Sequence, residues 1–164
     1  MEQPDPRSSE ANPASARPAE AVVIGAARPA DLGAVVALVG AAGLPTDDLT
    51  SAVGLALFAA WRGDELVGVA GVQALEEAGL LRSLAVAPGF RGRGLGAELV
   101  RAAEAHARAR GVRDLYLLTT TAEAYFARRG YLHADRSAAP AALQATGEFQ
   151  SLCPASAACL RKAL

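Results

Sequence analysis

The feature that most constrains the fold is a segment, residues 84–96, in which an apolar run passes through a glycine-rich turn into a long helical pattern. The glycines let backbone amides approach a ligand closely, and the N-terminal end of the following helix adds positive potential. Such a strand–turn–helix unit favours an anion such as pyrophosphate, and Arg91 and Arg93 can add charge. A flexible, basic connector is the competing interpretation. The spacing matches neither a Walker loop nor Gly-x-Gly-x-x-Gly.

The apolar pattern along the rest of the chain predicts a mixed α/β domain. Short β-branched runs alternate with stretches of helical spacing, and glycines or prolines separate them. The expected order is β-α-α-β-β-β-α-β-α-β-β, with a further helical stretch before the last strand. Strands are expected near residues 22–24, 58–61, 66–72, 80–86, 114–119, 131–136 and 157–162, and helices near 31–39, after 49, and near 94–110, 122–129 and 140–146.

Composition predicts one folded domain preceded by a disordered leader. Apolar residues make up 52% of the 164 residues and charged residues 20%, enough to bury a core. Residues 1–20 contain four of the nine prolines and no apolar run, so we expect the leader there and the folded domain over residues 21–164. The leader lacks the order of a signal peptide, and no segment is long and apolar enough to span a bilayer. We therefore expect a cytoplasmic protein without a membrane partner.

Charge and metal-ligand counts argue against two further classes. The formal net charge is −1, whereas a nucleic-acid-binding chain needs an excess of cations. Cys153 and Cys159 have the spacing Cys-x5-Cys without further ligands beside them, so we expect no structural zinc site and no metal. We expect Cys153 and Cys159 to be ordinary thiols, with a Cys-x5-Cys metal or arsenic site as the weaker alternative, and His106 and His133 to be structural.

Two motifs resemble the GNAT superfamily of acetyl-CoA-dependent N-acetyltransferases. The first is Arg-x-x-Gly-x-Gly at Arg91, Gly94 and Gly96, and the second is Ala-Glu-Ala-Tyr-Phe-Ala-Arg-Arg-Gly-Tyr at residues 122–131. Together with the element order, the resemblance covers residues 22–164. It implies the α/β GNAT fold, a mixed six- to seven-stranded sheet flanked by about four helices, and an N-acetyltransferase domain over residues 21–164 that uses acetyl-CoA.

The resemblance also implies how acetyl-CoA binds. The amides of the glycine-rich loop would cradle the pyrophosphate, and the backbone of Leu84 and Val86, on a strand splayed from its neighbour, would pair with the pantetheine arm. Backbone N–H near Val86 would polarise the thioester carbonyl. Thr119 either lies near the cofactor or simply ends a β-branched run. The residues assigned to acetyl-CoA are Leu84, Ala85, Val86, Arg91, Gly92, Arg93, Gly94, Leu95, Gly96, Thr119 and Phe126.

A finer resemblance appears in the segments 43–49, 117–123 and 148–157, which are similar to the arsenic-resistance N-acetyltransferases of the ArsN type. Relatives of that group acetylate the α-amino group of glutamate-like antimetabolites such as arsinothricin and phosphinothricin. The resemblance therefore implies a small, anionic, amino-acid-like amine as acceptor, and it is compatible with a homodimer.

The expected proton donor is displaced by one residue. Many GNAT enzymes have a tyrosine four residues before the glycine of the second motif, where this chain has Phe126. Tyr125 is adjacent, but one helical step rotates a side chain by about 100°. Either Tyr125 protonates the leaving thiolate from a shifted helix, or water does so; packing against the sheet is the structural alternative for both rings.

Arg82 stands where many relatives have a glutamate that acts as general base. Strand alternation predicts that Arg82 shares a face with Leu84 and Val86, where a guanidinium would bind an acceptor carboxylate or phosphinate in bidentate fashion. A surface arginine paired with Glu76 or Glu77 is the alternative. No spacing identifies the base, and the candidates for steering the amine are Asp47, Asp48, Glu76 and Glu77.

The sequence thus predicts direct acetyl transfer within a ternary complex, because neither cysteine lies in the motif over the thioester. A catalytically idle acyl-CoA-binding sensor is the alternative from another class. The motif positions that lack tyrosine and glutamate, Phe126 and Arg82, are the basis of that alternative.

Overall fold

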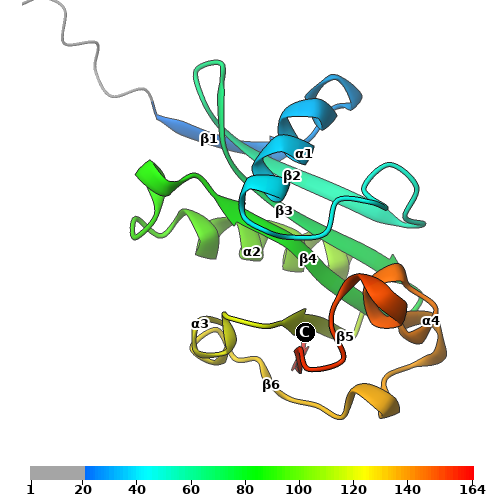
Figure 1. Cartoon of the computed structure of the whole chain (residues 1–164). Coiled ribbons are helices and arrows are strands. Elements are labelled where there is room, and N and C mark those ends of the chain that lie inside the picture. Colours follow the sequence, from blue (N-terminus) through cyan, green and yellow to red (C-terminus); the bar gives the residue numbers. More distant parts are fainter. Residues whose placement is uncertain (1–20) are drawn as a thin grey trace, which may run out of the picture.

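A computed structural model describes residues 21–164, in which seven strands form one mixed sheet with the order β1-β2-β3-β4-β5-β7-β6 (Figure 1). The predicted leader, residues 1–20, lies outside the described residues. The sheet and its four α-helices confirm the predicted fold class. The strands are β1 Val22–Ala26, β2 Leu55–Arg62, β3 Glu65–Leu75, β4 Ala78–Val86, β5 Asp114–Thr119, β6 Leu132–His133 and β7 Ala158–Ala163, and the helices are α1 Leu32–Ala41, α2 Leu95–Ala109, α3 Glu123–Ala127 and α4 Ala141–Gln144.

The helices cover the two faces of the sheet, with α1 and α2 on opposite sides (Figure 1). Apolar residues of α2, including Leu95 and Leu99, pack in the largest core cluster, whereas Val35 and Val39 of α1 pack in a separate one. The α2 contact is close: a Cβ at Gly68 of β3 would lie 2.8 Å from Leu99 Cδ1. Among residues 21–164, no helix is long and apolar enough to cross a membrane.

Strands β4 and β5 separate after a short parallel pairing, which confirms the predicted splay. Only Ala78–Leu80 of β4 pair with β5, at Asp114–Tyr116. From Leu81 onward, the β4 edge that faces β5 has no strand partner among the described residues. The backbone of this edge is therefore available to a ligand.

A bulge in β4 changes which side chains share a face. Between Arg82 and Ala85 the β4 strand advances three residues while β3 advances two, from Gly71 to Val69, and Ser83 has φ +57°. Leu84 and Val86 consequently pack with the α2 cluster, whereas Arg82 bonds to groups on the other side of the sheet. The prediction that Arg82 shares a face with them is wrong, because one extra residue reverses the alternation.

Two predicted elements differ from the observed ones. The short helix expected after residue 49 is absent, and residues 47–51 form turns in which Leu49 packs against the α1 cluster. The strand expected over residues 131–136 is reduced to β6, which pairs only with β7. Residues 136–153, between β6 and β7, form short helical turns. The Arg136 guanidinium holds this segment in place by donating hydrogen bonds to several of the segment's backbone carbonyl groups.

Candidate active site

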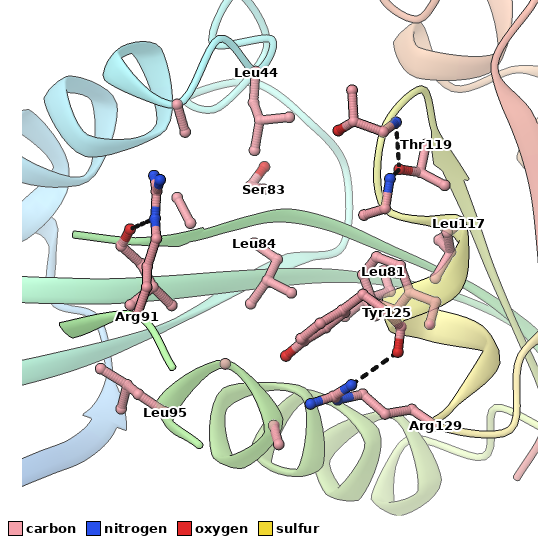
Figure 2. Close-up of a pocket in the computed structure, with 18 of the residues that line it drawn as sticks. Leu44, Leu81, Ser83, Leu84, Arg91, Leu95, Leu117, Thr119, Tyr125 and Arg129 are labelled. Atoms are coloured by element: carbon pink, nitrogen blue, oxygen red, sulfur yellow. Dashed lines mark hydrogen bonds between the residues drawn. The ribbon is translucent and has the colours of Figure 1, made fainter. Parts of the chain in front are cut away.

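The β4–β5 split opens into a cavity of about 560 Å³ (Figure 2). Its walls come from β4, the loop before α2, the end of β5 and α3. The residues predicted from the sequence that line it are Arg82, Leu84, Ala85, Val86, Arg91, Gly92, Gly94, Leu95, Gly96, Thr119, Tyr125 and Phe126. Arg93 is the predicted residue that does not, and its guanidinium instead lies 5.6 Å from the Phe90 ring centre.

The glycine-rich loop presents backbone N–H groups at one end of this cavity. Gly92 and Gly94 adopt φ of +75° and +80°, and Gly94 is the N-cap of α2. The first hydrogen bond of the helix runs from Glu98 N–H to the Gly94 carbonyl, at 3.1 Å, so the amides of residues 95–97 have no acceptor within the helix. This end is built to bind an anion.

Tyr125 reaches into the cavity from α3 (Figure 2). Its hydroxyl oxygen is buried and has no hydrogen-bond partner among the described residues. A Cβ at Gly96 would lie 2.5 Å from that oxygen, so the glycine makes room for it beside the N-terminus of α2. Burial raises the pKa of Tyr125, which keeps the phenol protonated at neutral pH. An unpaired buried hydroxyl is costly, so this group is placed to meet a ligand.

Arg129 and Phe126, which both pack against the Tyr125 ring, differ in role. The Arg129 guanidinium lies 3.5 Å from the Tyr125 ring centre and donates to the Tyr125 carbonyl, at 2.8 Å, which holds the ring in place. Phe126, one helical step away, is buried and packs edge-on against Tyr131 with ring centres 5.6 Å apart. Both residues line the cavity, but Phe126 also belongs to the buried core, whereas the Tyr125 hydroxyl has no protein partner among the described residues.

Thr119 marks the end of β5 at the cavity wall. Its Oγ1 accepts hydrogen bonds from the backbone N–H groups of Ala122, at 2.9 Å, and Thr121, at 3.4 Å (Figure 2). The hydroxyl oxygen thereby shapes the turn into α3. Thr119 lines the cavity, but its hydroxyl oxygen is already engaged by the chain itself.

Arg82 is buried within a charged cluster at the other end of the cavity. Its Nη1 and Nη2 donate to the two carboxylate oxygens of Asp48 at 2.7 and 2.6 Å, and Nε donates to Ser83 Oγ at 3.1 Å. Glu148 Oε1 lies 3.3 Å from Nε. The alternative of a surface arginine paired with Glu76 or Glu77 is wrong, because the Arg82 side chain is 0% exposed and its partners come from two distant loops.

Burial and pairing give the two carboxyl groups of this cluster opposite pKa shifts. Hydrogen bonds from Arg82 lower the pKa of Asp48, whereas burial raises the pKa of Glu148. The Cys153 thiol lies against Glu148, and burial raises its pKa to about 12. Asp48 was among the predicted candidates; Glu148 was not, since only the folded chain brings residue 148 to residue 82.

The remaining singled-out residues lie away from the cavity. His106 packs edge-on against Phe58, with ring centres 5.4 Å apart, and His133 is exposed near Glu123. Cys153 and Cys159 are free thiols. Within residues 21–164, no group of three or more histidine, cysteine or acidic side chains could hold a metal ion.

Comparisons with known proteins agree with this geometry. An amino-acid acetyltransferase from Ralstonia nicotianae is 44% identical over 59 residues, which are 36% of this chain and only 13% of that protein. N-acetylglutamate synthase from Neisseria gonorrhoeae, complexed with coenzyme A and N-acetyl-glutamate, aligns with a TM-score of 0.73 and 20% identity over 88% of this chain and 35% of that one. Rv2747 from Mycobacterium tuberculosis, in complex with CoA and NLQ, aligns with a TM-score of 0.67 and 21% identity over 87% of this chain and 99% of that one.

The family itself is identified by a model that covers more than half of the sequence. The model described as "Acetyltransferase (GNAT) family" matches residues 37–131, a range that includes α2, the β4–β5 split and α3. This match confirms the superfamily resemblance carried by the two sequence motifs. The chain belongs to the GNAT family of acetyltransferases.

Proposed function

We propose that this protein transfers the acetyl group of acetyl-CoA to the amine of a small, anionic, amino-acid-like acceptor. The observation that carries the proposal is the β4–β5 cavity, which has free helix N-terminal amides at one end and a buried phenol in its wall. Among the described residues, the charged ones that line it are arginines, Arg82, Arg91 and Arg129. The Arg82 side chain is itself buried against Asp48 and Glu148.

The proposed cofactor end suits the CoA part of acetyl-CoA. The amides of residues 92–97 would bind the pyrophosphate, and the unpaired edge of β4 would bind the amides of the pantetheine arm. Arg91 lies beside this path, with its Nε bonded to the Val86 carbonyl at 2.9 Å (Figure 2). Arg91 therefore adds charge near the phosphates while it holds the end of β4.

The proposed reaction is direct. Attack of the neutral amine on the thioester carbon forms the N–C bond and breaks the C–S bond, and Tyr125 donates its proton to the leaving thiolate. The amine loses a proton to solvent, and the Tyr125 phenolate recovers one from solvent. Backbone N–H near Val86 would stabilise the developing oxyanion. The raised pKa of Tyr125 keeps its proton available at neutral pH.

The acceptor class follows from charge and from the relatives. Arg91 and Arg129 line the cavity without a carboxylate partner among the described residues, so they favour an acceptor with a carboxylate or phosphinate. The curated relatives are amino-acid acetyltransferases. Arsinothricin and phosphinothricin, which the ArsN resemblance implies, belong to this class. The Arg82 guanidinium is held by Asp48, so for Arg82 to bind the anion directly Asp48 has to move.

Thiol release tests the proposal. The protein is mixed with acetyl-CoA and, separately, with glutamate, phosphinothricin, arsinothricin, and a neutral and a cationic amine of similar size. We expect CoA release with the anionic acceptors and a kcat/KM at least about tenfold lower with the others. If acetyl-CoA binds in calorimetry but no acceptor leads to CoA release, the protein is instead an idle acyl-CoA sensor. Preference for the cationic amine would contradict the acceptor class.

A further inference from the structure

We propose that the Ser83 hydroxyl donates the hydrogen bond that binds a carboxylate of the acceptor. This inference rests on the proposed function, and it assigns the acceptor contact to a residue that no motif marks. It also gives Arg82 a positioning role, because Arg82 acts on the cavity through Ser83.

Ser83 lies on the cavity wall in an unusual backbone conformation. Its φ of +57° is one of two positive values among the described non-glycine residues, and the other is Glu76 in an exposed turn. A non-glycine residue in this region costs about 1–3 kcal/mol and persists where the surroundings enforce it, most often at functional sites. Glycine would relieve this strain without changing the backbone. The retained side chain therefore points to a use for the hydroxyl.

The hydrogen bonding of Ser83 leaves its proton free. Oγ accepts from Arg82 Nε at 3.1 Å, and Ser83 is 6% exposed. Among the residues that the structure describes, the hydroxyl hydrogen has no acceptor. A hydroxyl oxygen that accepts from a guanidinium becomes a stronger donor, because adjacent hydrogen bonds polarise one another. The Arg82 guanidinium thus orients the Ser83 hydroxyl so that its hydrogen is left for a ligand.

The location of Ser83 selects the acceptor over the cofactor. Ser83 lies three residues before Val86, about 10 Å along an extended strand and away from the glycine-rich loop. Figure 2 shows Ser83 on the side of β4 near Leu44, opposite Leu95 and α2. Leu44 follows α1 and also lines the cavity, so this end is bounded by the loop that Asp48 ties to Arg82.

Two substitutions separate a chemical role from a conformational one. Ser83→Ala removes the hydroxyl and keeps the strain, whereas Ser83→Gly removes both. We expect both variants to raise the acceptor KM by about 10- to 100-fold, the scale of a lost hydrogen bond to a charged group, with the KM for acetyl-CoA unchanged. Ser83→Gly should unfold at the same or a higher temperature than the parent, so misfolding cannot explain its loss.

Glu76→Gly is the matched control, because it relieves the same kind of strain in an exposed turn away from the cavity. It should leave both KM values unchanged. Each variant is assayed with L-glutamate and with its two monoamides. The Ser83 hydroxyl binds one carboxylate of glutamate if the parent acetylates one of the monoamides less well than glutamate, whereas Ser83→Ala acetylates that amide and glutamate equally well.

The outcomes distinguish the two proposals. If the parent releases CoA with anionic acceptors but Ser83→Gly and Ser83→Ala keep the parental KM, the Ser83 inference is wrong and the proposed function stands. If the acceptor KM rises only in one of the two variants, backbone shape is responsible, and the inference is again wrong. If the parent acetylates none of the acceptors, both proposals fail.

Discussion

Replacing Arg82 by methionine tests the interpretation of the buried cluster. The substitution keeps an unbranched side chain but removes a guanidinium that is 0% exposed and bonded to both Asp48 oxygens at 2.6 and 2.7 Å. Asp48 is 19% exposed and can recover some hydration, whereas Glu148 is 5% exposed and cannot. Removing one partner of a buried ion pair costs about 3–5 kcal/mol, because the other charge is left uncompensated.

That free-energy loss corresponds to a fall in Tm of about 10–20 °C for a domain of this size. Calorimetry at pH 7 measures the Tm, and urea unfolding at the same pH measures the free energy of unfolding. Arg161→Met is the matched control. Arg161 donates from Nε and Nη2 to the single oxygen Asp114 Oδ1 at 2.9 and 2.7 Å, which are similar distances, but the two side chains are 48% and 32% exposed. An exposed pair contributes about 0–1 kcal/mol, so the control should lose only a few degrees.

Two results would refute the reasoning. Equal destabilisation of Arg82→Met and Arg161→Met would show that burial does not strengthen the Arg82 pair. An unchanged Tm in Arg82→Met would show that the guanidinium does not stabilise the fold through its buried carboxylate partners. In a double-mutant cycle, Asp48→Asn should cost little further stability once Arg82 has been replaced.

Three further predictions concern the cofactor loop, the proton donor and pH. Gly94→Asp should abolish acetyl-CoA binding in calorimetry, because a carboxylate would oppose the anion at the amides and strain the +80° φ, whereas Gly89→Asp, just before the amide loop, should retain most of the affinity. Tyr125→Phe should lower kcat by about 100-fold with the KM for acetyl-CoA unchanged; a fall below about threefold would assign protonation to solvent. Burial raises the pKa of Glu148 in the folded state above its unfolded-state pKa of about 4.3. The protonated carboxyl therefore stabilises the fold below about pH 4.3, and this stability is lost as pH rises through the folded-state pKa. Glu148→Gln should therefore gain stability relative to the parent as pH rises above about 4.3 in urea unfolding, and parallel pH profiles would contradict this.

The sequence by itself determined the parts of this protein that depend on local chemistry. The glycines at 92 and 94 have a left-handed backbone that few other residues adopt, and the following apolar spacing forms α2 as expected. The resemblance of the two motifs to the GNAT superfamily added the splayed strand and the cavity-lining residues, including Tyr125. Each of these signals lies within a few residues of the feature that it specifies.

Only the tertiary structure determined how the residues at the acceptor end of the cavity are arranged. The bulge at Ser83 depends on the register between β3 and β4, and it moved Arg82 to the face opposite the expected one. The partners of Arg82 lie 34 and 66 residues away, in segments whose own patterns predicted a helix entry and a tail. A buried guanidinium has to be paired with carboxylates, and these can come from any segment that the fold places beside it. A local sequence pattern therefore does not identify the partners.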